Sequence, residues 1–219
     1  MGSITRSFAN NIGSSGILTA SAVTNTTVED VTSFDNAASS ATLVLLSTQT
    51  ANDSATISFT TGLDSTYDEY IFKCIDIHPR TDVPDFTFNL STDSGSNYNV
   101  TKTTTAFRAI HNEADTSTGL GYETSFDLAQ STAFQPIATG VGNGADESCT
   151  VTLTLFNPSS TTYVKHFIST ASNYIGSDYA ENLFTAGYGN TTSAVNAVRF
   201  QMSSGNFDGI IKLYGVKKS

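Results

Sequence analysis

Charge and long apolar runs are both scarce in this 219-residue sequence, and each scarcity argues against a class of protein. Charged residues make up 14% of the chain, and 20 acidic against 10 basic residues give a net charge of −10. The basic residues are scattered, whereas nucleic acids and anionic membranes are bound by clustered cations, so neither partner is expected. The longest apolar run, Leu43–Leu46, is far shorter than the roughly 18 residues of a membrane-spanning helix. A secretory leader is not seen either, so synthesis in a cytoplasm is expected.

Catalytic and cofactor-binding motifs are also missing from the sequence. It contains no Gly-x-Ser-x-Gly elbow, no phosphate-binding loop and no Cys-x-x-Cys pair. Cys74 and Cys149 lie in apolar, strand-like settings, which favours reduced and half-buried side chains. Adjacent acids such as Asp68 and Glu69 would point to opposite faces of a strand, a poor arrangement for acid–base partners. No catalytic, cofactor-binding or metal-binding residue is therefore assigned, although a glycosidase-type carboxylate pair assembled by the fold stays open.

From residue 42 onward, short apolar runs rich in β-branched and aromatic residues alternate with clusters of turn residues. No segment carries the apolar stripe of an amphipathic helix, and there is no alternation of strands with helices. This pattern predicts an all-β fold, an antiparallel β-sandwich that resembles a jelly roll, over residues 42–219. The expected strands are Thr42–Thr48, Ala55–Thr60, Tyr70–Ile77, Asp85–Thr92, Thr103–Ile110, Gly121–Phe126, Glu147–Asn157, Tyr163–Ser172, Leu183–Tyr188, Ala194–Met202 and Ile210–Val216.

Several of these strands predict one buried face. In Thr150–Leu155, apolar residues alternate with threonines, which is typical of an antiparallel strand with one face in the core. Ile210–Val216 predicts a core strand with Ile211, Leu213 and Gly215 on one face and Ile210, Lys212 and Tyr214 on the other. Asp93-Ser94-Gly95 predicts a hairpin turn in which the glycine takes a positive φ, with a calcium-binding loop as the alternative.

The histidines and their neighbouring acids are the candidate sites that the sequence offers. His111, Glu113 and Asp115 alternate, so on a strand they would share one face and could hold a divalent cation. A polar loop after the preceding strand is the preferred interpretation. His78 is expected in a turn that leaves a strand, and His166 is expected as a hydrogen-bonded histidine within a sheet.

Residues 1–41 differ in composition from the rest of the chain. They are low in charge and rich in Ser, Thr, Asn and Ala, and their apolar residues recur without a helical or strand period. Such spacing cannot build a separate core, yet so many apolar side chains are unusual in a solvated linker. We therefore predict an extended docking arm that becomes ordered against a partner surface. The expected anchors are Ile4, Phe8, Ile12, Ile17, Leu18, Val23, Val28, Val31 and Phe34.

Four phrases of the sequence carry a resemblance to a known group of proteins: TYDEYIFKCIDIHPRTD, FNLSTDSGSNYNVTKTTTAFRAIHNEADTS, LFNPSSTTYVKHF and VRFQMSSGNFDGIIKLYGV. In this order they resemble a module of structural proteins of tailed bacteriophages, marine phages in particular, found in tail-fibre-like and other virion-associated chains. The resemblance covers residues 42–216. Residues 1–41 look like the short segments by which phage fibre proteins dock on a virion. The resemblance implies no cofactor and no catalytic residues.

The resemblance implies a virion structural protein that is made in the host cytoplasm and assembles with other tail or capsid proteins. A tail-fibre or spike component is expected, docked by its arm, with contact to a host surface glycan or protein as a further expectation. A head decoration protein that cements capsid subunits is the alternative, and a glycan-active enzyme is a second alternative. Phage fibres are usually trimers, so a homo-oligomer, and a trimer first, is expected.

Overall fold

The computed structural model describes residues 42–218, and every regular element in this range is a β-strand. No helix in this range is long and apolar enough to cross a membrane. The predicted docking arm and its nine anchors lie outside the described residues. The strands are β1 (Leu43–Ser54), β2 (Ile57–Phe59), β3 (Glu69–Pro79), β4 (Phe86–Ser91), β5 (Lys102–Asn112), β6 (Thr118–Tyr122), β7 (Gln135–Ala138), β8 (Cys149–Phe156), β9 (Lys165–Ile175), β10 (Tyr179–Gly189), β11 (Ala197–Met202) and β12 (Phe207–Val216).

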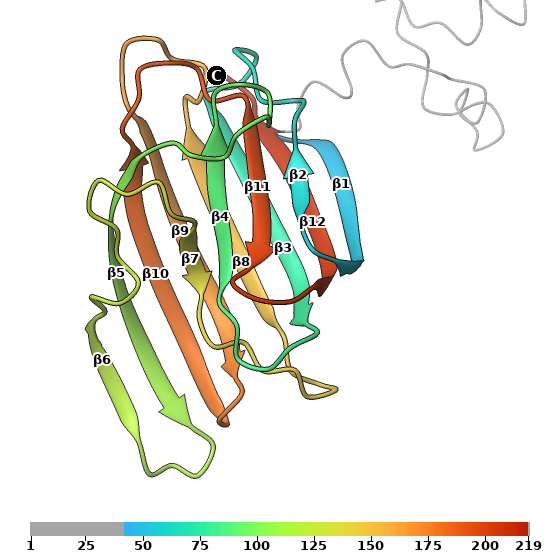
Figure 1. Ribbon diagram of the computed structural model, residues 1–219, viewed down its shortest axis with the longest axis vertical. Helices are drawn as coiled ribbons and strands as arrows, with labels where there is room; N and C mark the ends of the chain where they lie inside the picture. The colour runs from blue at the N-terminus through green and yellow to red at the C-terminus, as the bar shows by residue number, and fades with distance from the viewer. Residues whose placement is uncertain (1–41, 219) are drawn as a thin grey trace, which may run out of the picture. The chain divides into compact units, whose positions relative to one another are not determined.

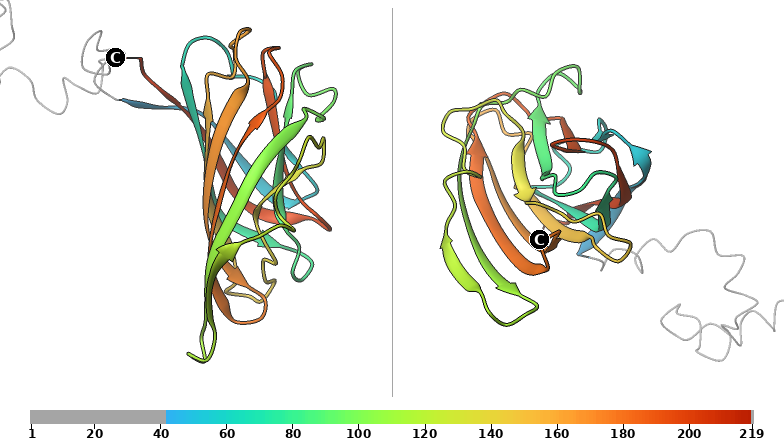
Figure 2. Two further views of the ribbon diagram at one scale, coloured as in Figure 1. Left: turned by 90° about the vertical axis from the view of Figure 1, so that its left-hand side faces the viewer. Right: turned by 60° about the horizontal axis from the view of Figure 1, so that its bottom comes forward.

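The strands form two antiparallel sheets that pack face to face (Figure 1). The larger sheet has eight strands in the order β1-β12-β3-β8-β9-β10-β5-β6, and the smaller has four in the order β2-β11-β4-β7. Figure 2 shows from the side how the smaller sheet covers one face of the larger one. The predicted all-β antiparallel sandwich is confirmed.

Eight of the twelve strands have the connectivity of a jelly roll. When β5, β6, β9 and β10 are set aside, the remaining strands, renumbered 1 to 8 along the chain, form sheets in the orders 1-8-3-6 and 2-7-4-5. These are the two four-stranded sheets of a double Greek key. The hairpin β5–β6 is inserted between β4 and β7, and the hairpin β9–β10 between β8 and β11. These four inserted strands widen the larger sheet, so that β5 and β6 lie past the edge of the smaller one (Figure 1).

Phenylalanine fills the space between the two jelly-roll sheets. Phe200 on β11 lies against Phe72 on β3 of the opposite sheet, with ring centroids 5.3 Å apart. It also contacts Phe59, Phe86 and Phe88 within its own sheet. All five rings are almost completely buried, so this aromatic cluster supplies much of the apolar area that drives folding.

Strand alternation places these side chains inward, as the sequence predicts. β8 buries Cys149, Val151, Leu153 and Leu155 while its threonines face outward. β12 lies between β1 and β3 and buries Ile211, Leu213 and Gly215, which confirms the predicted core strand.

Some strand limits differ from the prediction. β1 continues to Ser54 rather than ending at Thr48, because its second half still pairs with β12. His78 lies inside β3, which runs to Pro79, so the predicted turn at His78 is wrong. β7 is not predicted at all, and the strand predicted at Gly121–Phe126 is β6, which ends at Tyr122.

The segment around Asp93 forms a turn but not a hairpin. Ser94 and Gly95 have φ values of 59° and 88°, so the predicted positive φ at the glycine is confirmed. Residues 97–101 form no strand, and β4 pairs instead with β11 and β7, so the predicted hairpin is wrong. Hydrogen bonds from Asn97 and Ser91 lower the pKa of Asp93 to about 2. Its carboxylate is thus engaged in holding the turn.

Candidate functional site

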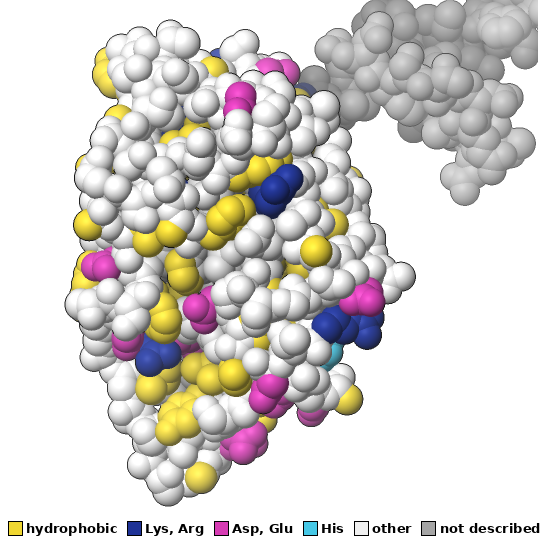
Figure 3. Space-filling model, in the orientation of Figure 1, with side chains coloured by type: hydrophobic (Ala, Val, Ile, Leu, Met, Phe, Trp, Pro, Cys, Tyr) yellow, Lys and Arg dark blue, Asp and Glu magenta, His cyan; other side chains and the backbone are white. Residues whose placement is uncertain are grey.

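The inserted strands carry all the charged side chains that are buried within residues 42–218. Lys102 lies on β5, Lys165 on β9 and Glu181 on β10, and none of them is more than 2% exposed. The jelly-roll strands bury only neutral side chains. On the side of the smaller sheet, charged side chains at the surface are also few, and several of them lie in small groups of opposite charge (Figure 3). Because burying a charge is costly unless it is paired or hydrogen-bonded, these three positions are the first place to look for a site.

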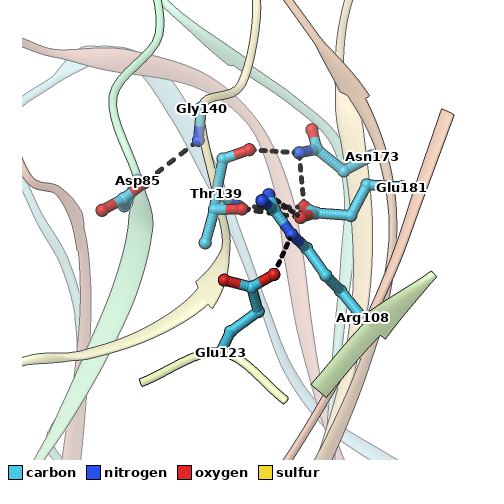
Figure 4. A network of polar contacts seen from close by, with 7 residues as sticks. All are labelled: Asp85, Arg108, Glu123, Thr139, Gly140, Asn173 and Glu181. Atoms are coloured by element: carbon cyan, nitrogen blue, oxygen red, sulfur yellow. Dashed lines mark hydrogen bonds and ion pairs between the residues drawn. The ribbon is translucent and has the colours of Figure 1, made fainter. Parts of the chain in front are cut away.

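Glu181 is the centre of a network of polar side chains (Figure 4). Its Oε1 lies 3.1 Å from Nη1 of Arg108 and accepts a hydrogen bond of 2.8 Å from Oγ1 of Thr139. Its Oε2 accepts from Nδ2 of Asn173 at 3.0 Å. Arg108 also bonds Glu123, with 2.9 Å between Nε and Oε1. We call these five residues the Glu181 network.

This network fixes the Glu181 carboxylate instead of leaving it free for chemistry. Both oxygens already accept hydrogen bonds, and the guanidinium of Arg108 is shared between two carboxylates. Within residues 42–218, no group of three or more His, Cys, Asp or Glu is placed to hold a metal ion. The network therefore ties the residue that follows β7, Thr139, to strands β5, β9 and β10.

Asp85 lies beside the network (Figure 4), and its Oδ1 accepts a hydrogen bond of 3.0 Å from the backbone N–H of Gly140. Burial raises the pKa of Asp85, the hydrogen bond from Gly140 opposes this, and the charge of Glu181 raises the pKa further. A raised pKa is what a general acid requires. Its hydrogen-bond partner is a backbone amide, however, and not a nucleophile or a second acid.

Lys102 and Lys165 flank Gly189 in one row across β5, β10 and β9. Nζ of Lys102 donates to Oδ1 of Asn89 at 2.5 Å and to the carbonyl oxygen of Val100 at 2.9 Å. Within residues 42–218 no carboxylate pairs with this amine, and burial lowers the pKa of Lys102 to about 7. A desolvated lysine of this kind is unusual and is not predicted from the sequence.

Lys165 is arranged in the same way as Lys102. Its Nζ donates to the carbonyl oxygens of Tyr163 at 2.7 Å and Thr191 at 3.2 Å, and burial lowers its pKa. Both amines therefore tie the start of a strand to the carbonyl oxygens of nearby loops.

The outer face of the larger sheet, opposite the core, carries a different kind of surface. A groove of about 510 Å³ runs over the inserted strands there. His166 and Tyr188 form part of its lining, with ring centroids 6.0 Å apart, together with Phe156. The remaining lining residues are Thr103, Thr104, Thr105, Phe167, Ile168, Ala186 and Gly187. This lining of rings, methyl groups and hydroxyls suits contact with another molecule better than it suits catalysis.

Further apolar side chains extend this surface along the inserted strands. Phe107 of β5 and Phe184 of β10 are direct cross-strand partners, and their rings stack with centroids 4.9 Å apart. Phe107 is 45% exposed and Ile168 is 52% exposed. Lys73 and Lys212, on the same face, are also directly opposite each other on neighbouring strands. Their positive charges repel each other, and an acidic group on a bound molecule would reduce this repulsion.

The structure separates the three residues that the sequence offers as metal ligands. Nε2 of His111 bonds Oδ1 of Asp115 at 3.0 Å, whereas Glu113 accepts a hydrogen bond from Tyr174. Residues 113–117 form the turn between β5 and β6, so the preferred interpretation as a polar loop is confirmed.

The other predicted residues have mixed outcomes. His166 lies within β9 next to the buried Phe167, so its predicted place in a sheet is confirmed. Its ring is exposed and contacts Tyr188, and it forms no hydrogen bond within residues 42–218. Nδ1 of His78 lies 2.7 Å from the carbonyl oxygen of Glu147.

Cys74 and Cys149 are free, as predicted, but they are fully rather than half buried. Burial raises the pKa of both thiols, which makes them unreactive.

Comparison with known proteins adds no assignment to this geometry. No known protein family matches the chain, and no curated protein matches it.

Proposed function

We propose that this chain is a non-enzymatic structural protein of a tailed-phage virion, a tail-fibre or spike component that docks through residues 1–41. The resemblance of residues 42–216 to virion modules supports this proposal. The observation that carries it is the contrast between a closed aromatic jelly roll and inserted strands with an exposed apolar and hydroxyl-rich outer face. A rigid scaffold that presents a contact surface is what a particle component needs.

The state of the titratable groups supports a role without catalysis. Glu181 is held by four donors, counting both the N–H and the hydroxyl of Thr139. His111 pairs with Asp115, and the two thiols are buried. A nucleophile activated by an adjacent base, the minimal arrangement for covalent catalysis, is not formed by these groups.

The outer face supports a role in contact with a host surface or another virion protein. Aromatic rings beside hydroxyl groups form good contact surfaces, because they bury apolar area and still offer hydrogen bonds. Phe107, Ile168 and Phe184 provide the apolar part, and the outward threonines of β8 provide hydroxyls. A host glycan or a host surface protein is the partner that this surface would contact in a fibre or spike.

A head decoration protein is the alternative, and it would use the same outer face to bridge capsid subunits. The number of copies per particle separates the two roles, since fibres and spikes are present in far fewer copies than a capsid-covering protein. Quantitative mass spectrometry of purified virions measures this number. A copy number comparable to that of the major capsid protein would replace the fibre role by the decoration role.

Deletion of residues 1–41 tests the docking step. We expect the truncated protein to fold, with a melting temperature close to that of the full chain, and to be lost from assembled particles. Incorporation at the normal copy number would show that the sandwich itself carries the docking surface. A glycan-active enzyme, the second alternative, would be established by polysaccharide turnover that is lost in Asp85→Asn but retained in the matched control Asp93→Asn.

A further inference from the structure

Three of the four edge strands carry features that block further pairing. β2 has only three residues, and β7 has four, including Pro136. β1 breaks register with β12 twice, between Leu45 and Ser47 and between Ala51 and Ser54. Short strands, prolines and bulges are the usual means by which proteins prevent edge-to-edge association.

The fourth edge strand, β6, carries none of these features. Its sequence Thr-Gly-Leu-Gly-Tyr contains no charge and no proline, and its five residues pair with β5 without a break in register. Every residue of the strand is exposed, Leu120 to 78% and Tyr122 to 54%. Figure 1 shows that β6 lies beyond the smaller sheet, and among the described strands it pairs with β5 alone.

The ladder between β5 and β6 shows which backbone groups of β6 face outward. The N–H of Glu123 donates to the carbonyl oxygen of Ala106 at 2.9 Å. Bonded residues alternate in an antiparallel ladder, so Gly119 and Gly121 bond to β5. The residues that direct both N–H and C=O away from β5 are Thr118, Leu120 and Tyr122.

The exposed side chains of β6 continue the apolar outer face of the inserted strands. Tyr122 is the cross-strand partner of Phe107, which in turn is the partner of Phe184. Leu120 lies one pair further along on the same face. The unpaired backbone edge and the exposed apolar side chains therefore lie together. A strand added at β6 would hydrogen-bond this edge and place further side chains beside Leu120 and Tyr122.

We propose that β6 is a self-association edge, at which β6 of a second copy pairs antiparallel about a two-fold axis through Leu120. In this register Leu120 faces Leu120 of the second copy, and Thr118 faces Tyr122. The three outward residues then form about six hydrogen bonds between the copies. A Cβ added at Gly121 would meet no atom within 4 Å, so the inner face of the strand is not crowded.

A second copy is the occupant that this strand favours. An antiparallel strand of the same sequence is self-complementary about a two-fold axis, which is the commonest symmetry of homo-oligomers. The protein as a whole carries a net charge of −10, and β6 is a segment where two copies can meet without placing like charges opposite each other. Pairing joins the two larger sheets into one, with the apolar row continuous across the axis.

The interface is small, so dimerisation should be weak in dilute solution and stronger where assembly brings many copies together. The inference goes beyond the proposed virion role, because it concerns the purified protein and does not require a particular place on a particle. The self-association can therefore hold even if the virion role is disproved, and the virion role can hold even if the chain does not self-associate through β6.

Cysteine substitutions test the register in the full chain. Hydrogen-bonded cross-strand partners have Cα atoms about 5.5 Å apart, within the range of a disulfide. Leu120→Cys should therefore form a disulfide-linked dimer under mild oxidation. In the matched variant Thr118→Cys, the two Cα atoms would be about 14 Å apart, and this variant should crosslink at least about tenfold more slowly. A mixture of Thr118→Cys and Tyr122→Cys should crosslink readily. Equal rates for Leu120→Cys and Thr118→Cys would overturn the proposed register.

Backbone substitution tests the association itself. Leu120→Pro removes an N–H that points away from β5, so the β5–β6 ladder should survive while the second copy is excluded. Analytical ultracentrifugation should show concentration-dependent dimers for the unmodified chain and for Leu120→Val, and monomers for Leu120→Pro. Leu120→Lys provides the same test if the proline variant does not fold. A monomeric unmodified chain at about 1 mM, or dimers unaffected by proline and lysine, would refute the proposal.

Discussion

The jelly-roll strands and the inserted strands of this sandwich differ in the kinds of side chain that they bury. Between the jelly-roll sheets, Phe59, Phe72, Phe86, Phe88 and Phe200 fill the core with apolar rings. The inserted strands also place Phe167 and Leu183 in this core, but in addition they bury two lysines and a glutamate, and they expose aromatic side chains on their outer face. Apolar side chains can be buried without polar partners, whereas the charged side chains of the inserted strands are held by hydrogen bonds and an ion pair.

The difference indicates where function is added to this fold. The exposed rings of Phe107 and Phe184, the open edge of β6 and the three buried charges all reduce stability, and all lie on β5, β6, β9 and β10. Departures from simple folding rules concentrate at functional sites in many proteins. Because these features of the inserted strands lower stability, most of the stability has to come from the jelly roll.

Truncation of the aromatic cluster should have the largest effect. Phe200→Ala removes a ring that contacts four others, and we expect a loss of about 3–5 kcal/mol in the free energy of unfolding. Phe107→Ala, on the exposed face of an inserted strand, should cost less than about 1 kcal/mol. Chemical denaturation at pH 7 measures both. Similar losses for the two variants would mean that the jelly roll is not the main source of stability.

Removal of the buried carboxylate should have the next largest effect. Glu181→Ala leaves the N–H and hydroxyl of Thr139 without an acceptor and Asn173 with the carbonyl oxygen of Thr139 alone, while Arg108 retains Glu123. We therefore expect a loss of about 2–4 kcal/mol in the free energy of unfolding. The control Glu123→Ala removes a half-buried partner and should cost about 1 kcal/mol or less. If Glu123→Ala destabilises the protein as much as Glu181→Ala does, Glu181 is not the centre of the network.

Lys102 should make stability depend on pH. Burial lowers its pKa from 10.5 to about 7, so between these values the unfolded chain holds a proton that the folded chain lacks. The free energy of unfolding therefore rises with pH in this window. Lys102→Met lacks this contribution, and the stability of the unmodified chain relative to the variant should increase by about 1–2 kcal/mol from pH 7 to 9. A difference that stays constant over this range would show that Lys102 keeps an ordinary pKa.

The smallest effect is expected at Asp85. Its raised pKa means that, just above pH 3.8, the folded chain holds a proton that the unfolded chain has lost, so ionisation lowers stability as the pH rises through this window. Asp85→Asn keeps an acceptor for the N–H of Gly140 and removes the repulsion from Glu181. Thermal unfolding at pH 7 should show no loss and a gain of up to about 0.5 kcal/mol, after allowance for solvent screening. A loss above 1 kcal/mol would show that the charge itself is needed.

The sequence predicts the jelly roll well because its strands bury one face, which leaves an alternating pattern in segments such as Thr150–Leu155. β6 has both faces exposed and two glycines, so it leaves no such pattern, and β7 is too short to leave one. The buried lysines could not be predicted, because a lysine between threonines or beside a histidine looks like a surface residue. The register places Lys102, Gly189 and Lys165 in one row, and the burial of both lysine side chains shows that this row faces inward.

The place of β12 has a consequence for how the protein is made. This strand is the last one within residues 42–218, yet it lies between β1 and β3 in the larger sheet. A nascent chain on the ribosome therefore holds β1 without its partner until the C-terminal residues emerge. Pairing of the first and last strands closes a loop of more than 150 residues, and such non-local contacts make folding slow, on the order of milliseconds to seconds. Folding of residues 42–218 should accordingly not be completed before β12 leaves the ribosome, and a ribosome-stalled chain that lacks β12 should remain sensitive to protease.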